Sequence, residues 1–219
     1  MCYSLAASLT IGLGLGCIGT ILVKRSCAYN RKMIVYAIFP LVFSIHQIIE
    51  GVIWYALQNP FKNDAIFVYG YSIIAFGFWP ILIPFAAMVA EQRELWRRIW
   101  FLCVGLGVAL SVYLWGKLVL SDGIDVNVVN HSLAYKPLFA DPPDAIIAGY
   151  VALTTVPSII SKNRVINIFG WCVLGSFLIS VIKSKPAWYS VWCMISAISS
   201  AVIAFAITKN NNQENRLIG

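Results

Sequence analysis

Long apolar runs, separated by short polar connections, follow one another along the whole chain. A helix that crosses a bilayer needs about 20 consecutive apolar residues, and continuous rather than alternating apolar runs favour helices over a barrel. Seven runs have roughly this length: 4–23, 33–57, 65–90, 98–120, 144–160, 165–182 and 187–207. The pattern predicts an all-α membrane protein, a seven-transmembrane-helix bundle formed by residues 1–208, with a short polar tail at 209–219.

Composition supports a membrane protein and argues against a nucleic-acid-binding one. Only 11% of the residues are charged and the mean hydropathy is +0.79, whereas about a quarter of the residues of a soluble domain are charged. The net charge of +7 comes from Lys and Arg in the short connections, which is a topology signal and not a binding face. The partners we expect are therefore membrane lipids, with a small molecule or a lipid as candidate ligand.

The basic residues also predict an orientation. Eleven of the sixteen Lys and Arg lie after the first, third and fifth runs or in the tail: Lys24, Arg25, Arg31, Lys32, Arg93, Arg97, Arg98, Lys162, Arg164, Lys209 and Arg216. Because cytoplasmic connections are enriched in Lys and Arg, the N-terminus is expected outside and the C-terminus inside. No basic residue precedes the first apolar run, so we expect it to stay in the membrane as a helix. The expected location is a bacterial cytoplasmic (inner) membrane.

The most informative polar residue is Glu50, within the apolar run 34–57. A carboxylate near the centre of a membrane helix costs several kcal/mol, about 2.5–3.5 on insertion scales, so it normally faces the bundle interior and has a partner. Gln47, His46 and Trp54 lie three residues before, four before and four after it, so the four share one helical face. Glu50 is thus predicted to be buried with a hydrogen-bond partner, in a structural or a functional role. Its carboxylate is also placed to orient the His46 imidazole.

The longest connection, residues 121–143, lies outside in this topology. Residues 124–128 alternate apolar and polar, which allows a short strand or hairpin over the bundle. It contains His131, and Asp144 follows it at a helix start, where an acid also favours the helix dipole. Both are candidate site residues, and each has a plain structural alternative, as a solvated loop residue or a helix cap.

Two of the six cysteines, Cys2 and Cys193, fall in the outer half of the predicted bundle. They are predicted either to form a disulfide, to line one pocket with Glu50, or to lie apart. One of them is also a candidate nucleophile served by His131 or His46. No Cys-x-x-Cys or Cys/His zinc spacing occurs, so any divalent metal would need scattered ligands, for which Glu50, His131 and Asp144 are candidates.

Several short motifs resemble an uncharacterised bacterial family of multi-span membrane proteins. The start Met1-Cys2-Tyr3-Ser4 resembles the Met-Cys-Phe-Ser start of that family, and further matches are the following: Gln47-Ile48-Ile49-Glu50-Gly51 with Trp54, Trp79-Pro80, the stretch 131–135, and Ser190-Val191-Trp192-Cys193. The resemblance covers the whole chain and implies roles for Cys2, Gln47, Glu50, His131 and Cys193. The family pattern has Gln where this chain has His46. It implies no activity.

Three function classes remain open. The first is a membrane enzyme with an outward-facing site for a lipid or lipid-linked substrate; the second is a transporter, channel or proton-coupled carrier that uses Glu50; the third is a non-enzymatic small-molecule sensor or assembly subunit. The candidate catalytic residues are Glu50, His131 and Cys2, and the candidate ligand-binding residues are His46, Gln47, Trp54, Asp144 and Cys193.

Overall fold

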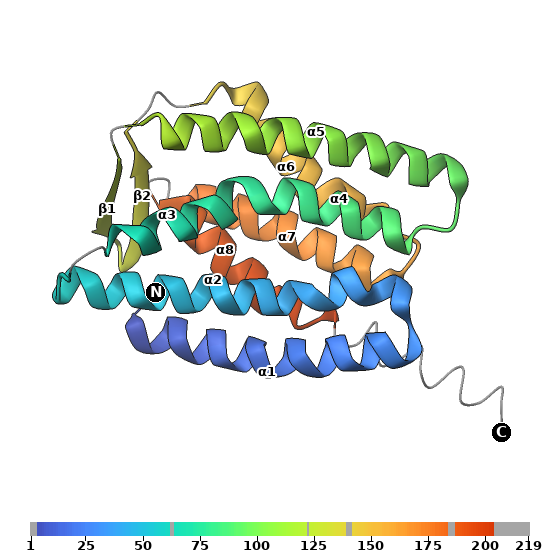
Figure 1. The fold of residues 1–219 in the computed structure, drawn as a ribbon, viewed down its shortest axis with the longest axis horizontal. Helices are drawn as coiled ribbons and strands as arrows, with labels where there is room; N and C mark the ends of the chain where they lie inside the picture. The colour runs from blue at the N-terminus through green and yellow to red at the C-terminus, as the bar shows by residue number, and fades with distance from the viewer. Residues whose placement is uncertain (1–3, 62–63, 122, 139–141, 184–186, 204–219) are drawn as a thin grey trace.

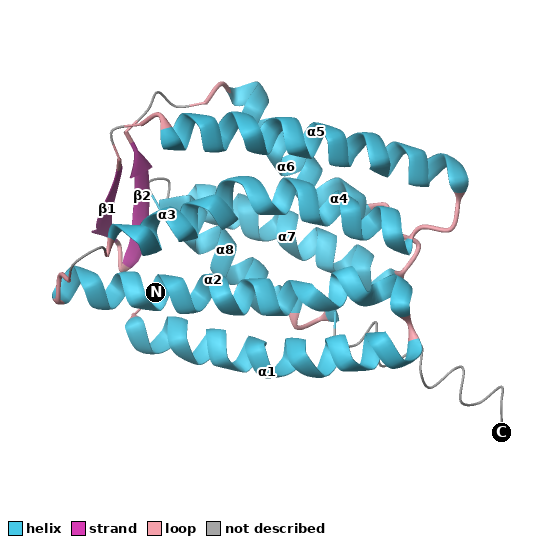
Figure 2. Cartoon of the chain, in the orientation of Figure 1, coloured by secondary structure: helices cyan, strands magenta, loops and turns pink. Residues whose placement is uncertain are grey.

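The computed structural model describes residues 4–61, 64–121, 123–138, 142–183 and 187–203. Helices form the body of the molecule and a two-stranded hairpin lies at one end (Figures 1 and 2). In chain order the elements are α1 (Leu5–Tyr29), the 3-10 turn η1 (Arg31–Met33), α2 (Ile34–Gln58), α3 (Ala65–Ile73), the π-helical segment η2 (Ile74–Phe78), α4 (Trp79–Ala90), α5 (Glu94–Val119), β1 (Ile124–Val129), β2 (Ser132–Pro137), α6 (Asp144–Ile159), α7 (Arg164–Lys183) and α8 (Trp188–Ser200).

Each predicted apolar run contains a helical segment of the structure. Helices α3, η2 and α4 follow one another without a break, so they form one segment, Ala65–Ala90. Within the described residues, five segments are long and apolar enough to cross a membrane: Leu5–Tyr29, Arg31–Gln58, Ala65–Ala90, Glu94–Val119 and Arg164–Lys183. Helix α6 is shorter, and α8 is described to Ser200. The predicted polar tail, residues 209–219, lies outside the described residues.

Two helices, α1 and α5, extend several residues beyond their apolar runs. Helix α1 continues to Tyr29, where the Ser26 hydroxyl donates to the Asn30 carbonyl at 2.8 Å and the Asn30 N–H donates back to the Ser26 carbonyl at 3.0 Å. Helix α5 begins four residues before the predicted span, at Glu94, because an acid in the first turn favours the helix dipole and pairs with basic residues one turn later. Apolar periodicity alone does not detect such polar helix ends.

The third segment is interrupted in its middle by η2, just before Pro80. A proline removes one backbone donor, and a π segment changes the hydrogen-bond register, so carbonyls are released there. Side chains of neighbouring helices donate to them: Trp115 Nε1 to the Ile73 carbonyl at 3.0 Å, Ser111 Oγ to Gly77 at 2.6 Å, and the Tyr150 hydroxyl to Ala75. The neighbouring helices thus satisfy the interrupted backbone, as expected where a membrane helix is broken.

Helices α4 and α5 approach each other closely. A Cβ atom added at Gly107 would lie 2.1 Å from the Pro80 carbonyl oxygen, and one at Gly77 would lie 2.2 Å from the Trp115 indole. Only a residue without a side chain fits at these two positions. The backbone contact of Gly107 with Pro80 and the packing of the Trp115 indole on Gly77 hold α5 against the interrupted segment, and Ser111 and Trp115 lie within hydrogen-bonding distance of its carbonyls.

The predicted hairpin is confirmed. Strands β1 and β2 pair antiparallel, with Ile124 opposite Pro137 and Val129 opposite Ser132. The two turn residues, Asn130 and His131, both have positive φ, 49° and 59°, as a two-residue type I′ turn requires. Leu133 and Tyr135 of β2 are buried and pack in one apolar cluster with residues of α2, α3 and α8.

The two ends of the bundle differ in charge. The connections α1–α2, α4–α5 and α6–α7 lie at one end, here the basic end, and the hairpin lies at the other, here the hairpin end (Figure 1). The basic end holds most of the described Lys and Arg residues: Lys24, Arg25, Arg31, Lys32, Arg93, Arg97, Arg98, Lys162 and Arg164. The fold thus gathers in space nine of the eleven basic residues that the topology prediction used, and the other two, Lys209 and Arg216, lie outside the described residues.

Candidate functional site

Glu50 lies on α2 facing α8, and its side chain is buried, as the sequence predicts. Gln47, one turn earlier, donates its amide to Oε2 at 3.1 Å, and the Ser190 hydroxyl of α8 donates to Oε1 at 2.5 Å. The ion pairs among the described residues join Glu91 and Glu94 to arginines, and Glu50 takes part in none of them. Two neutral donors therefore stabilise this carboxyl group, and they link α2 to α8.

His46 is also fully buried, but it faces α3 rather than Glu50. Its Nε2 lies 3.3 Å from the Tyr71 carbonyl oxygen. Because a carbonyl only accepts, Nε2 must carry the proton, while Nδ1 has no hydrogen-bond partner in the described part of the chain. The expectation that the Glu50 carboxylate orients this imidazole is wrong, since the partners of Glu50 are Gln47 and Ser190.

Three rings stack between α2 and the hairpin. The His46 ring lies on Tyr71 with centroids 4.0 Å apart, and Tyr71 lies on Tyr135 of β2 at 4.1 Å and nearly parallel. The Tyr135 hydroxyl has no hydrogen-bond partner among the described residues, and the Tyr71 hydroxyl lies next to the Cys193 thiol. Burial raises the pKa of the Tyr135 phenol well above its usual range, and the charge of the nearby Glu50 carboxylate adds to this shift. The stack therefore places the hairpin beside the Glu50 cluster, defined as Gln47, Glu50 and Ser190.

A cavity of about 720 Å³ lies at the hairpin end, between β2, α6, α7 and α8. Aromatic side chains form much of its wall: Phe76, Tyr135, Phe177, Trp188 and Tyr189. Lys136 and Asp144 supply one charge of each sign, and both are exposed. Tyr135 belongs both to this wall and to the ring stack, and Tyr189 precedes Ser190 on α8. An amphipathic cavity thus adjoins the buried polar cluster.

The other sequence candidates are spread over the hairpin end. His131 is exposed at the tip of the hairpin, and Asp144 is exposed at the first residue of α6. Trp54 is buried, and its indole N–H has no partner among the described residues. Cys193 is a buried free thiol packed in the cluster of Tyr71 and Tyr135.

The structure does not test the predicted pairing of the cysteines, and it does not bring the candidate metal ligands together. Cys2 lies outside the described residues, so its predicted approach to Cys193 does too. In the described part of the chain, no three His, Cys, Asp or Glu side chains group as a metal site would require. Glu50, His131 and Asp144 are accordingly not brought together as ligands, since the first is buried and the other two are exposed.

Three residues that complete the site were not among the candidate site residues: Tyr71, and also Tyr135 and Ser190, which the sequence analysis named only as parts of motifs. Signals for two of them exist in the sequence. Ser190 lies three residues before Cys193, on the same helical face near the start of the last span. Tyr135 follows Leu133 at the spacing of two that places both on one face of a strand. For Tyr71, one aromatic residue among many in its span, we find no such signal.

Comparisons with known proteins give a family and no activity. No curated protein and no solved structure matches the chain. A family model described as "Family of unknown function (DUF6629)" matches residues 1–217. This agrees with the resemblance to an uncharacterised family, and it covers both the hairpin cavity and the Glu50 cluster. The chain belongs to the family of unknown function DUF6629.

Proposed function

We propose that the protein is an integral membrane protein whose single domain, residues 1–208, crosses a bacterial cytoplasmic membrane seven times. The N-terminus and the hairpin would lie outside, and the basic end and the tail inside. Seven helical segments and the collection of basic residues at one end support this topology. Reporter fusions after residue 208 and within the turn Asn130–His131 test it, and the proposal fails if both report the same side.

The cavity at the hairpin end is suited to a lipid or a lipid-linked molecule. Its aromatic wall offers apolar contact for chains, while Lys136 and Asp144 offer charged contacts for a head group. A cavity with an apolar wall and a few polar groups is the usual form of a ligand site. In the proposed orientation it opens at the outer leaflet, where such a substrate is dissolved.

The chemistry that fits this site best is hydrolysis of an ester in the bound molecule, with Glu50 as general base and Ser190 as nucleophile. The observation that carries this assignment is the hydrogen bond from the Ser190 hydroxyl to Glu50 Oε1 at 2.5 Å. A nucleophile and a base in contact are the minimum that covalent catalysis needs. Both side chains are 2% exposed, so the substrate must displace a neighbour to reach them, and Tyr135 is shared by the cavity and the cluster.

The proposed hydrolysis has two steps, transfer of the acyl group to Ser190 and its release by water. Glu50 takes the proton of Ser190 as Oγ bonds to the ester carbonyl carbon, and the proton passes to the departing alcohol oxygen. Water then attacks the acyl group, Glu50 accepts a proton from this water, and the Ser190 oxygen leaves and recovers that proton. The Gln47 amide, which donates a hydrogen bond to Glu50 Oε2, holds the carboxyl group in place during both steps.

A fluorophosphonate probe tests this function, because it bonds to an activated serine and releases fluoride. Wild-type protein in detergent should be labelled at Ser190, and Glu50→Gln should slow the labelling by about 100-fold, as expected for loss of a general base. Ser199→Ala removes another hydroxyl of α8, one that donates only within its own helix, and should be labelled normally. An unlabelled Ser190 in folded wild-type protein would contradict the proposal.

A second candidate is a proton-coupled carrier with Glu50 as the proton-binding group. The observation that favours it is the interrupted third segment, with its π turn and Pro80, which lies against Glu50's helix and is the kind of broken helix that transporters use. Proteoliposomes loaded with a pH dye distinguish the two candidates. A carrier acidifies them under a substrate gradient and loses this ability in Glu50→Gln but not in Ser190→Ala. A protein that binds lipid without either activity would be the sensor or assembly subunit.

A further inference from the structure

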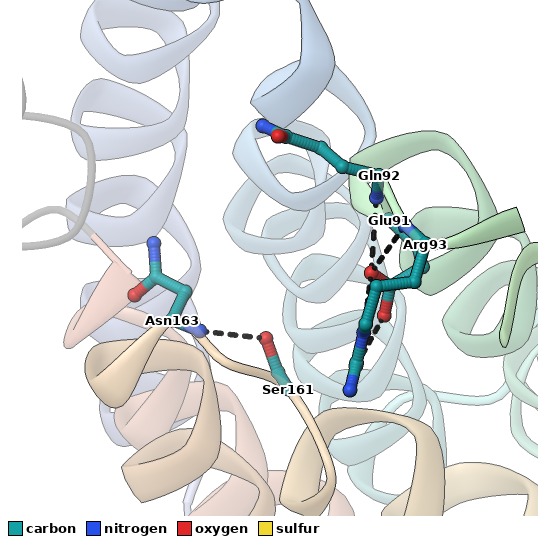
Figure 3. A network of polar contacts seen from close by, with 5 residues as sticks. All are labelled: Glu91, Gln92, Arg93, Ser161 and Asn163. Atoms are coloured by element: carbon teal, nitrogen blue, oxygen red, sulfur yellow. Dashed lines mark hydrogen bonds and ion pairs between the residues drawn. The ribbon is translucent and has the colours of Figure 1, made fainter.

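A second cavity lies at the basic end, away from the hairpin cavity. It encloses about 450 Å³ between three connections, at residues 30–33, 91–93 and 161–163. Figure 3 shows two of them facing each other, with Glu91, Gln92 and Arg93 on one and Ser161 and Asn163 on the other. Side chains distant in the sequence thus surround one space.

Among the described residues that line this cavity, the one acidic side chain already has a full set of hydrogen-bond donors. Glu91 accepts from Arg93 Nε at 3.0 Å and Nη2 at 2.6 Å, and from the backbone N–H groups of Gln92 and Arg93 at 2.9 and 3.0 Å (Figure 3). Lys32 and Lys162 also line the cavity, and neither has an acidic partner among the described residues. The cavity therefore presents two unpaired positive charges.

A buried hydroxyl at this cavity also lacks a partner. Tyr36 lines it, is 1% exposed, and among the described residues its hydroxyl has no partner at hydrogen-bond distance. The Ser158 hydroxyl is the polar side-chain group that interacts with the Tyr36 phenol, and it too has no partner at hydrogen-bond distance among the described residues. Buried polar groups are nearly always hydrogen-bonded, so an unpartnered hydroxyl in the wall of a cavity points to an acceptor that the cavity is built to receive.

We propose that this cavity binds a phosphate or phosphate-ester group, with Lys32 and Lys162 as its charged donors and Tyr36 as its buried donor. A phosphate offers several oxygen acceptors, which suits donors that approach from separate connections. The enrichment of Lys and Arg in cytoplasmic connections explains basic residues at this end of the bundle. It does not require them to surround a cavity with a buried hydroxyl. The phosphate group can belong to an anionic lipid or to a soluble molecule.

Two binding measurements on the purified full chain separate these sources. The first uses nanodiscs of phosphatidylcholine with and without phosphatidylglycerol, and counts retained lipid by native mass spectrometry. The second titrates glycerol 3-phosphate in detergent by calorimetry. Binding of phosphatidylglycerol alone identifies a lipid head group, and binding of glycerol 3-phosphate identifies a site that accepts soluble ligands.

The decisive comparison is between two double variants of equal charge. Lys32→Gln with Lys162→Gln should weaken binding by about tenfold or more, because both charged donors are lost. Lys24→Gln with Arg25→Gln removes two exposed charges at the same end that do not line the cavity, and should change the dissociation constant less than twofold. Tyr36→Phe should weaken binding by about threefold, as for one neutral hydrogen bond.

Either of two results would overturn the proposal. One is equal weakening in the two double variants, which would mean a general attraction of anions to a basic surface. The other is the absence of saturable binding of either ligand to wild-type protein. Because the readout is binding at the basic end, neither result bears on the proposed reaction of Ser190.

Discussion

Two glutamates, one inside the bundle and one at its basic end, show two ways of accommodating a carboxyl group. Glu50, inside the helices, has neutral donors on two elements, Gln47 of α2 and Ser190 of α8. Glu91, just beyond the end of α4, has Arg93 and backbone N–H groups of its own connection. The first group therefore joins distant parts of the chain, whereas the second organises a single loop.

This difference predicts where substitutions matter. Removing a buried group leaves its partners unpaired in a place that water does not reach, which costs more than the lost bond itself. Removing a group at the boundary with water allows its partners to be solvated, so an ion pair there is worth little. Substitutions in the Glu50 cluster should thus affect the whole fold, and those at Glu91 only its connection.

The largest effect is expected for Glu50→Leu. The Gln47 amide and the Ser190 hydroxyl would both lose their acceptor, and each buried unpaired group costs about 1–3 kcal/mol. We expect a loss of about 2–4 kcal/mol in the free energy of unfolding, with less protein recovered from membranes, as measured by denaturation in detergent. Glu50→Gln keeps an oxygen acceptor and should fold while losing the proposed activity. Equal stability of the two variants would show that the cluster does not join α2 to α8.

Ser190→Ala should have the next largest effect. It removes one donor to Glu50 and leaves that carboxyl group with Gln47 alone, at a cost of about 1–3 kcal/mol. Ser199→Ala is the matched control on α8, since its hydroxyl donates only to the Ile195 carbonyl one turn earlier, and it should stay within about 0.5 kcal/mol of wild type. If Ser190→Ala and Ser199→Ala have the same melting temperature, the contact between Ser190 and Glu50 contributes nothing to stability.

A smaller effect is expected where the hairpin meets the cluster. Tyr135→Leu keeps an apolar side chain but removes the ring that stacks on Tyr71, and such ring pairs contribute about 0.5–1.5 kcal/mol beyond their buried area. Hydrogen exchange of β1 and β2 should become faster while that of α5 stays unchanged. Tyr113→Leu, at an exposed position of α5, is the control. Unchanged exchange in the hairpin would mean that the stack does not hold it.

The sequence predicted the helices well and the site only partly. Apolar run length alone places the helical segments, because the bilayer sets the length that an apolar run must have. Burial of Glu50 followed from its cost in lipid. The partner Ser190 is 140 positions away in the chain, and no periodicity encodes which helices meet. His46 shows the same limit: its spacing from Glu50 placed the two on one face, yet the ring turns to Tyr71.

The smallest effect, and the one with a distinctive pH dependence, is expected for Glu91→Gln. The hydrogen bonds from the Arg93 side chain are the main reason why the pKa of the Glu91 carboxyl falls from 4.5 to about 2. A folded-state pKa below the unfolded value means that the ionised carboxylate stabilises the fold above about pH 4.5 and that this contribution is lost as the pH falls through about 2.

The wild-type protein should therefore have a slightly higher melting temperature than Glu91→Gln at pH 7, and this gap in melting temperature should close between pH 4.5 and 2. Because the pair lies near water, 0.5 M salt should narrow the gap at pH 7 as well. A gap that persists at pH 2, or one as large as that of Glu50→Leu, would mean that the two glutamates do not differ in the way their surroundings indicate.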